Sequence, residues 1–74
     1  TYTDKVGFGS KVTVELMGKE YTYTLVGSEE SDPKKAMLSL ESPIGIALMG
    51  KKVGEKALVV MPDRQIEYLI KKID

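Results

Sequence analysis

The strongest constraint on the fold comes from two alternating segments, residues 11–17 and 21–26, on either side of Gly18. In KVTVELM and in YTYTLV, one kind of side chain returns at every second position. This period of two is typical of a half-buried β-strand. A glycine between two such strands indicates the turn of a β-hairpin. One face of the predicted hairpin carries Val12, Val14, Leu16, Tyr21, Tyr23 and Leu25.

The rest of the chain predicts a loop, a short helix and three more strands. Residues 27–36 are polar and predict the loop, with one helical turn that Ser31 or Asp32 could cap. Strands follow at residues 37–42, 56–61 and 65–73, with the helix between the first two of them. In the second of these strands, Leu58, Val59 and Val60 form a continuous apolar run, which favours a central position in the sheet.

The helix has clear start and stop signals. Ser42 can cap the free backbone N–H groups at its start, and Pro43 supplies a helical φ where no N–H is needed. Gly50 ends it. The helix spans barely two turns and would be unstable alone, so it must pack on the sheet. Ile44, Ala47 and Leu48 share the face predicted to meet the sheet, whereas Ile46 and Met49 lie largely off it.

The order of elements favours one α+β domain, in which a bent antiparallel sheet wraps around one short helix. The chain has 74 residues. A chain of this size buries only roughly 60% of the surface that its unfolded form exposes, so its stability margin is thin. We expect residues 1–8 to form a linker that leads into the domain.

Composition excludes several classes of function. The chain contains no Cys and no His. The usual zinc ligand sets and nucleophiles activated by histidine are therefore excluded, and we expect no metal, no cofactor and no catalytic residue. Eleven basic and eleven acidic residues cancel, which argues against a domain that mainly neutralises the phosphates of DNA or RNA. We expect no direct sequence-specific contact with nucleic acid. With neither a membrane span nor a signal peptide in the pattern, we expect a cytoplasmic protein.

Three stretches of the chain together resemble a known family. DKVGFGSKVTVEL, YTLVGSEESDPKKAMLSLESPIGIALMGKKVGE and MPDRQIEYLIKKI are similar to the C-terminal domain of the bacterial Gre transcript cleavage factors, GreA more than GreB. The resemblance implies an FKBP-like fold. It also implies a monomeric domain that is not itself an enzyme and docks on RNA polymerase at the rim of the secondary channel. A separate N-terminal coiled coil, which we expect to be absent here, would promote cleavage of backtracked RNA.

The resemblance also implies where docking takes place. The family determinant is an acidic or amide residue followed by Ser-Pro at the start of the helix, which here corresponds to Glu41, Ser42 and Pro43. Glu41 is longer than the Asp or Asn often found in the family. Ile46 stands where Arg or Lys is common, and we include it in the predicted partner-binding site. Residues 62–64, PDR, replace a turn that contains glycine.

Each predicted site residue has a structural interpretation beside the functional one. Ser42 and Pro43 would begin the helix whether or not they touch a partner. Ile46 could fold over the sheet, or it could join Ile44 and Met49 in an apolar surface beside Pro43.

The sequence alone leaves two other functions open. A Gre-like inhibitor or regulator of polymerase would share this domain. An FKBP-type peptidyl-prolyl isomerase would need an aromatic pocket for the proline ring, which this chain is poorly supplied to build, and fold alone does not imply function.

Overall fold

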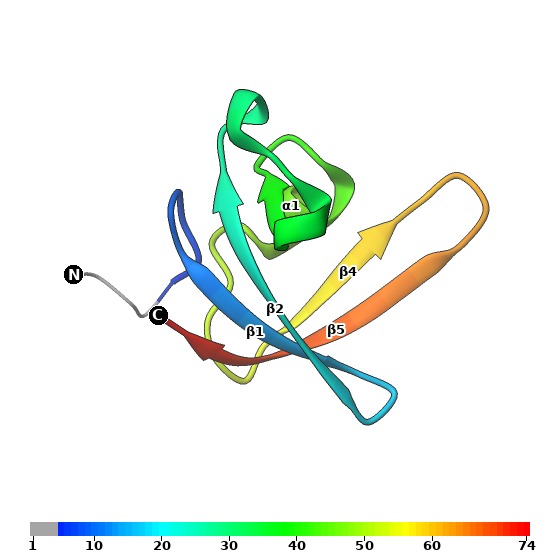
Figure 1. Ribbon diagram of the computed structural model, residues 1–74. Coiled ribbons are helices and arrows are strands. Elements are labelled where there is room, and N and C mark those ends of the chain that lie inside the picture. The colour runs from blue at the N-terminus through cyan, green and yellow to red at the C-terminus, as the bar shows by residue number, and fades with distance from the viewer. Residues whose placement is uncertain (1–4) are drawn as a thin grey trace.

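The computed structural model describes residues 5–74, which form a five-stranded sheet and one short α-helix (Figure 1). The strands are β1 (Lys11–Leu16), β2 (Lys19–Val26), β3 (Met37–Ser39), β4 (Lys56–Val60) and β5 (Gln65–Ile73). Two 3₁₀ turns, η1 (Ser28–Glu30) and η2 (Pro33–Lys35), connect β2 to β3, and the helix α1 (Pro43–Leu48) connects β3 to β4. The predicted α+β class and the bent sheet around one helix are confirmed.

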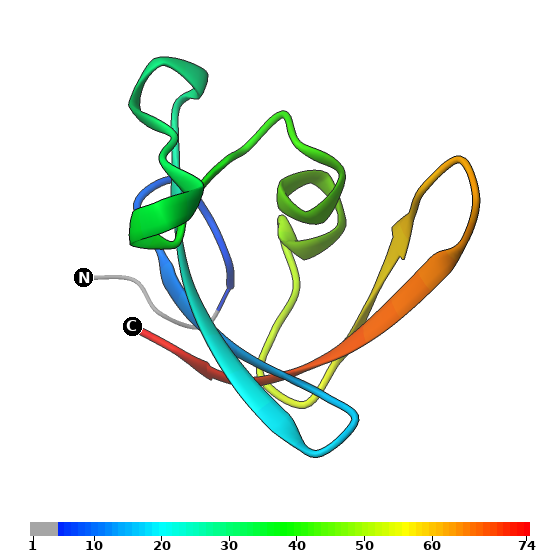
Figure 2. The ribbon, with the colours of Figure 1, turned by 45° about the vertical axis from the view of Figure 1, so that its right-hand side comes forward.

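The sheet has the order β3-β2-β1-β5-β4 and curls into a half-barrel around α1 (Figure 2). Three of its four pairings are antiparallel, as predicted. The pairing of β2 with β3 is parallel, with Thr24 opposite Met37, so the sheet is mixed rather than wholly antiparallel. The long β2–β3 connection makes the parallel pairing possible. It returns the chain to the level of Thr24, so that β3 runs in the same direction as the last three residues of β2.

The first hairpin closes through a two-residue turn. Leu16 pairs with Lys19, and between them Met17 and Gly18 have φ values of 52° and 82°. Two consecutive residues with positive φ make a type I′ turn, whose twist matches that of the flanking strands. Gly18 therefore lies in the turn as predicted. Met17 was expected to end the first strand, but it belongs to the turn and is 93% exposed.

β4 forms an edge of the sheet, so its predicted central position is wrong. Its residues alternate in burial: Ala57 and Val59 are fully buried, whereas Leu58 and Val60 are exposed. The apolar run therefore does not mean burial on both faces. Its outward members lie beside α1, where they line a groove described below.

β5 contains a bulge that keeps its apolar residues on one face. Val14 of β1 pairs with Ile70, and Thr13 pairs with Lys72, so Lys71 has no counterpart on β1. Side chains alternate between the two faces of a sheet, so without this extra residue Ile73 would point away from the core, to the face opposite Ile70. With it, Ile70 and Ile73 are both buried.

The core fills the concave side of the half-barrel, and α1 closes its mouth. Leu48 is fully buried, and Ile44 and Ala47 pack against the core from the same helix, as predicted. Val6 also belongs to the core. Its N–H donates to the Lys51 carbonyl and its carbonyl accepts from the Gly50 N–H, both at 2.9 Å. Val6 was expected in the linker at residues 1–8, but it is part of the domain. Residues 1–4 lie outside the described part of the chain.

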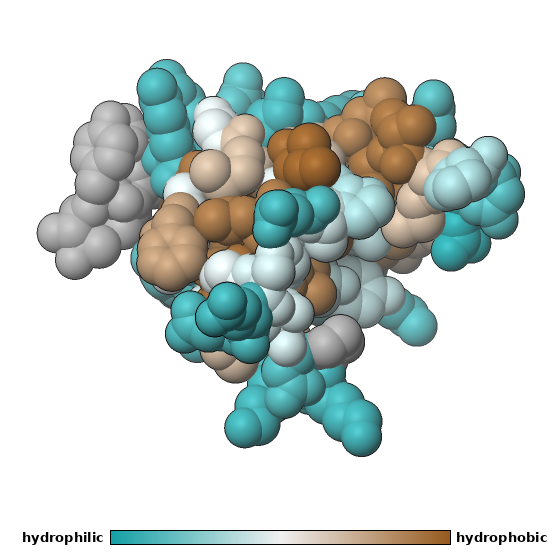
Figure 3. Space-filling view, turned by 90° about the horizontal axis from the view of Figure 1, so that it is seen from above, coloured by the Kyte–Doolittle hydropathy of each residue, from teal (hydrophilic) through white to brown (hydrophobic). Residues whose placement is uncertain are grey.

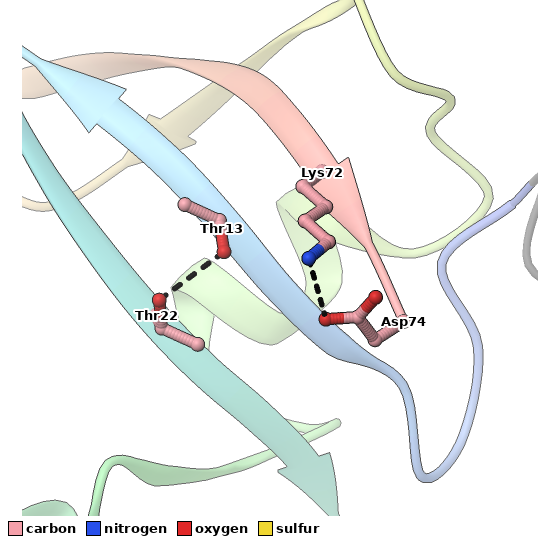
Figure 4. A network of polar contacts seen from close by, with 4 residues as sticks. All are labelled: Thr13, Thr22, Lys72 and Asp74. Atoms are coloured by element: carbon pink, nitrogen blue, oxygen red, sulfur yellow. Dashed lines mark hydrogen bonds and ion pairs between the residues drawn. The ribbon is translucent and has the colours of Figure 1, made fainter.

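The convex face of the sheet is polar where β1, β2 and the end of β5 lie side by side. The hydroxyl oxygens of Thr13 and Thr22 lie 3.1 Å apart across β1 and β2, and at the end of β5 an ion pair joins Lys72 to Asp74 (Figure 4). Glu15 forms a further ion pair with Lys71 at 3.3 Å. Such exposed pairs contribute little to stability, and here they keep the outer face in water. Among residues 5–74, no helix is long and apolar enough to cross a membrane.

Candidate functional site

The start of α1 is fixed by the two residues that the sequence singles out. Ser42 is the N-cap, with an extended backbone, and its Oγ accepts a hydrogen bond from the Gly45 N–H at 3.1 Å. Pro43 occupies the first helical turn. A cap of this kind stabilises a helix by about 1 kcal/mol. The result is a short, well-defined turn of helix at the protein surface.

An apolar groove runs between this helix and the exposed edge strand β4. It has a volume of about 260 Å³. We call it the α1–β4 groove; its lining residues are Pro43, Ile46, Ala47, Leu58 and Val60. Seen from above, the surface shows hydrophobic side chains among hydrophilic ones (Figure 3). Exposed apolar groups gathered in one place on a small domain are a feature of interaction sites.

All four residues of the predicted partner-binding site lie at this end of the helix. Glu41 and Pro43 are exposed, and Ser42 is half-buried beneath them. Ile46 is 64% exposed and lines the groove together with Pro43. We refer to Glu41, Ser42, Pro43 and Ile46 as the docking face.

Ile44 and Met49, the two residues that could have joined Ile46 in an apolar surface, do not line the groove. Ile44 packs against the core, and Met49, although 41% exposed, is not part of the groove lining. The residues that complete the groove are Leu58 and Val60, which sequence reasoning placed in a buried strand. The sequence signal was the apolar run at residues 58–60, but such a run does not tell whether both faces of a strand are covered.

A hydrogen-bonded cluster fixes the residue that precedes the helix cap. The Ser28 Oγ donates to the Glu41 Oε2, and the Glu41 N–H donates to the Ser39 Oγ at 3.0 Å. The hydroxyl oxygens of Ser28 and Ser39 lie 3.1 Å apart. No short-range sequence pattern marks these two serines, because Ser28 and Ser39 are 11 positions apart along the chain.

The acidic loop beside this cluster has a structural role. The Asp32 Oδ1 accepts from the Lys34 N–H at 3.1 Å, and its backbone exchanges two hydrogen bonds with Met37. Asp32 thus caps the second 3₁₀ turn; it is one of the two cap residues, Ser31 and Asp32, that the sequence predicts. In residues 5–74, no three His, Cys, Asp or Glu side chains gather in a way that could hold a metal ion.

The tyrosines of β2 lie on the face expected for them. The rings of Tyr21 and Tyr23 are stacked, with centroids 6.4 Å apart and an angle of 8° between their planes. Tyr23 packs against the core. Neither ring lines the α1–β4 groove.

The fold and the groove together define a class: a small α+β half-barrel that presents the capped start of one short helix beside an exposed strand edge. Comparisons with known proteins specify this class further. The family described as transcription elongation factor GreA/GreB, C-terminal domain, matches residues 1–74. The chain therefore belongs to the GreA/GreB C-terminal domain family, which confirms the resemblance seen in the sequence.

Individual relatives agree with this assignment. The chain is 48% identical over 67 residues to transcription elongation factor GreA of Maridesulfovibrio salexigens, covering 88% of this chain and 42% of that protein. It is 46% identical over 74 residues to the GreA of Syntrophomonas wolfei, covering 97% and 46%. The chain thus spans less than half the length of these relatives.

Solved structures show the same fold. GreA factor homolog 1 of Thermus thermophilus superposes with a TM-score of 0.83 at 26% sequence identity, covering 97% of this chain and 49% of that one. A GreA/GreB factor from Nitrosomonas europaea superposes with a TM-score of 0.79 at 22% identity, over 99% of this chain and 62% of that one. The second likeness concerns the fold alone.

Proposed function

We propose that this chain is the polymerase-docking domain of a GreA-type transcription elongation factor and binds bacterial RNA polymerase through its docking face. In this proposal the domain holds the factor at the rim of the secondary channel. It performs no chemistry itself, acts as a monomer in the cytoplasm, and contacts neither a membrane nor a specific nucleic-acid sequence. Cleavage of backtracked RNA would depend on a separate coiled coil.

The observation that carries the proposal is the α1–β4 groove beside the capped start of α1. Pro43 and Ile46 belong to both the groove and the docking face, so polar and apolar contacts are available side by side. Binding surfaces commonly combine a central apolar contact with a polar rim. Here Glu41 is the polar residue next to the groove, and the cap at Ser42 fixes the start of the helix that carries Pro43.

The test is to measure the affinity of the 74-residue chain for immobilised bacterial RNA polymerase core enzyme by biolayer interferometry. The variants are Pro43→Ala, Ile46→Ala and Glu41→Lys. Matched controls are Met17→Ala and Glu20→Lys, since both residues are exposed at the β1–β2 turn, at the opposite end of the molecule from α1 (Figure 1).

We expect the docking-face variants to bind at least about 5- to 10-fold more weakly, because truncating a central interface residue commonly costs more than 1 kcal/mol. The two controls should bind like the unsubstituted chain. Equal affinity for all five variants would remove the docking face from the interface. No binding by the unsubstituted chain would contradict the docking function.

The sequence leaves two alternative functions open, a peptidyl-prolyl isomerase and a Gre-like inhibitor or regulator of polymerase. Among residues 5–74, no aromatic side chain lines the α1–β4 groove, whereas a prolyl isomerase needs aromatic walls around the proline ring. Docking is therefore favoured over isomerisation. The likeness to both GreA and GreA factor homolog 1 is compatible with a stimulator or with an inhibitor. In our proposal the segment outside this chain decides between them.

A further inference from the structure

Glu41 is held by a closed ring of three hydrogen bonds. Its N–H donates to the Ser39 Oγ, the Ser39 hydroxyl meets the Ser28 hydroxyl, and the Ser28 Oγ donates to the Glu41 Oε2. The ring therefore starts at the backbone of Glu41 and ends at the side chain of the same residue.

The chemistry of its two ends fixes the direction of every hydrogen bond in the ring. A backbone N–H can only donate, and an ionised carboxylate can only accept. The Ser39 hydroxyl must therefore donate to Ser28, and the Ser28 hydroxyl must donate to Glu41. Each serine gives one hydrogen bond and receives one, so turning either hydroxyl away would break the ring.

The ring is anchored on both the sheet and the helix cap. Ser28 begins η1, and Ser39 is the last residue of β3. The Ser39 carbonyl also accepts hydrogen bonds from the Ser42 Oγ at 2.6 Å and from the Ser42 N–H at 3.1 Å. The carboxylate of Glu41 is thus fixed relative to the same cap that positions Pro43.

The arrangement leaves one side of the carboxylate available. Within residues 5–74, the Glu41 Oε1 accepts no hydrogen bond and forms no ion pair, and the residue is exposed next to Pro43. A free glutamate on a surface samples many rotamers, and a partner that binds it must immobilise it. Here the protein has already done so.

We propose that Ser28 is a positioning residue for docking: together with Ser39 it orients the Glu41 carboxylate toward an N–H or cationic donor group on the partner. This inference rests on the proposed function, because it concerns the same face. It assigns a role to the β2–β3 connection, which reaches the partner only through Glu41.

A double-mutant cycle separates positioning from general stability. The affinity of the 74-residue chain for RNA polymerase core enzyme is measured for Ser28→Ala, Ser28→Thr, Glu41→Ala and the Ser28→Ala/Glu41→Ala pair. Ser31→Ala is the matched control, since Ser31 lies in the same loop and its hydroxyl bonds to the Ser28 carbonyl rather than to the ring.

We expect Ser28→Ala to weaken binding about 2- to 10-fold, which corresponds to the cost of immobilising one long side chain. Ser28→Thr, which keeps the hydroxyl, should restore binding, and Ser31→Ala should leave it unchanged. In the Glu41→Ala background, Ser28→Ala should have no further effect, because no carboxylate remains to be positioned.

Three results would overturn the inference while the docking function stands. They are unchanged affinity in Ser28→Ala, equal weakening by Ser28→Ala in both backgrounds, and unchanged affinity in Glu41→Ala while Pro43→Ala still weakens binding. Loss of binding by the unsubstituted chain would instead refute the proposed function. Amide hydrogen exchange at Glu41 tests the ring without polymerase: it should be faster in Ser28→Ala than in Ser31→Ala, and equal rates would refute the ring.

Discussion

The carbonyl oxygen of Ser39 lies 2.1 Å from the position that a β-carbon on Gly45 would occupy. The backbone of α1 therefore rests directly on the end of β3, with no room for any side chain between them. Glycine inside a helix is about 1 kcal/mol less favourable than alanine. At this position the close approach outweighs that preference, and it brings the docking face to its place beside β3.

Replacing Gly45 by alanine should therefore destabilise the domain despite the better helix propensity. We expect a loss of about 1 to 3 kcal/mol or more in the free energy of unfolding, because the clash is with backbone and cannot be relieved by a rotamer change. Urea unfolding followed by circular dichroism measures it. Gly27→Ala is the control, since a β-carbon there would meet only the Glu30 Oε1 at 3.9 Å. Equal stability of the two variants would contradict the packing described.

Removing the helix cap should also cost stability. In Ser42→Ala, the Gly45 N–H loses its acceptor and the Ser39 carbonyl loses the shorter of its two donors from Ser42. We expect the free energy of unfolding to fall by about 0.5 to 2 kcal/mol. The measurement is the midpoint of urea unfolding at an unchanged m value, with Ser31→Ala as the control. A midpoint equal to that of the control would show that Ser42 does not act as a cap.

The turn between β1 and β2 offers a stabilising substitution. Met17 has a φ of 52°, in the left-handed region that asparagine tolerates better than methionine. Because Asn-Gly is the favoured pair in type I′ turns, Met17→Asn should raise the free energy of unfolding by about 0.5 to 1 kcal/mol. Thermal unfolding should show a higher midpoint. Met17→Val should lower it, and a rise in both variants would exclude this explanation.

One tyrosine should make the stability of the domain depend on alkaline pH. Partial burial, and then the nearby Tyr68 and Tyr21, raise the pKa of Tyr23 above its ordinary value. The folded state therefore holds this proton more tightly than the unfolded state. The resulting stabilisation is fully present below about pH 10, the unfolded pKa, and is lost as the pH rises through the raised folded pKa.

This dependence can be measured by absorbance titration of the tyrosinates. Tyr23→Phe should remove a component that ionises above the ordinary pKa of tyrosine, and Tyr21→Phe should leave such a component in place. Stability measured above pH 10 should fall less steeply in Tyr23→Phe than in the unsubstituted chain. A component above the ordinary pKa that persists in Tyr23→Phe would assign it to another tyrosine.

The parts of the fold that depend on neighbours in sequence could be predicted. The cap at Ser42, the proline after it and the stop near Gly50 define α1 because capping and backbone preference act over a few residues. The first hairpin was predicted for the same reason, through its alternation and Gly18. The family resemblance adds the prediction that partners dock at the start of this helix, and that part stays a prediction.

The features that were missed depend on residues far apart in the chain. Leu58 and Val60 stay exposed because β4 is an edge strand, and they line a groove because α1 lies beside them; a local apolar run carries neither fact. The parallel pairing of β3 depends on the path of a ten-residue connection. The ring at Glu41 needs Ser28, thirteen positions earlier, which no spacing rule brings to a helix cap.

The interior place of β5 has a consequence for how the domain comes into being. β5 is the last strand in the described sequence, yet it lies between β1 and β4, and within residues 5–74 β4 pairs with β5 alone. As the chain leaves the ribosome, β4 can join the sheet only through β5, so β5 must emerge before β4 is connected to β1. The sheet is therefore completed by contacts between the two ends of the described sequence, and contacts so distant along a chain slow folding.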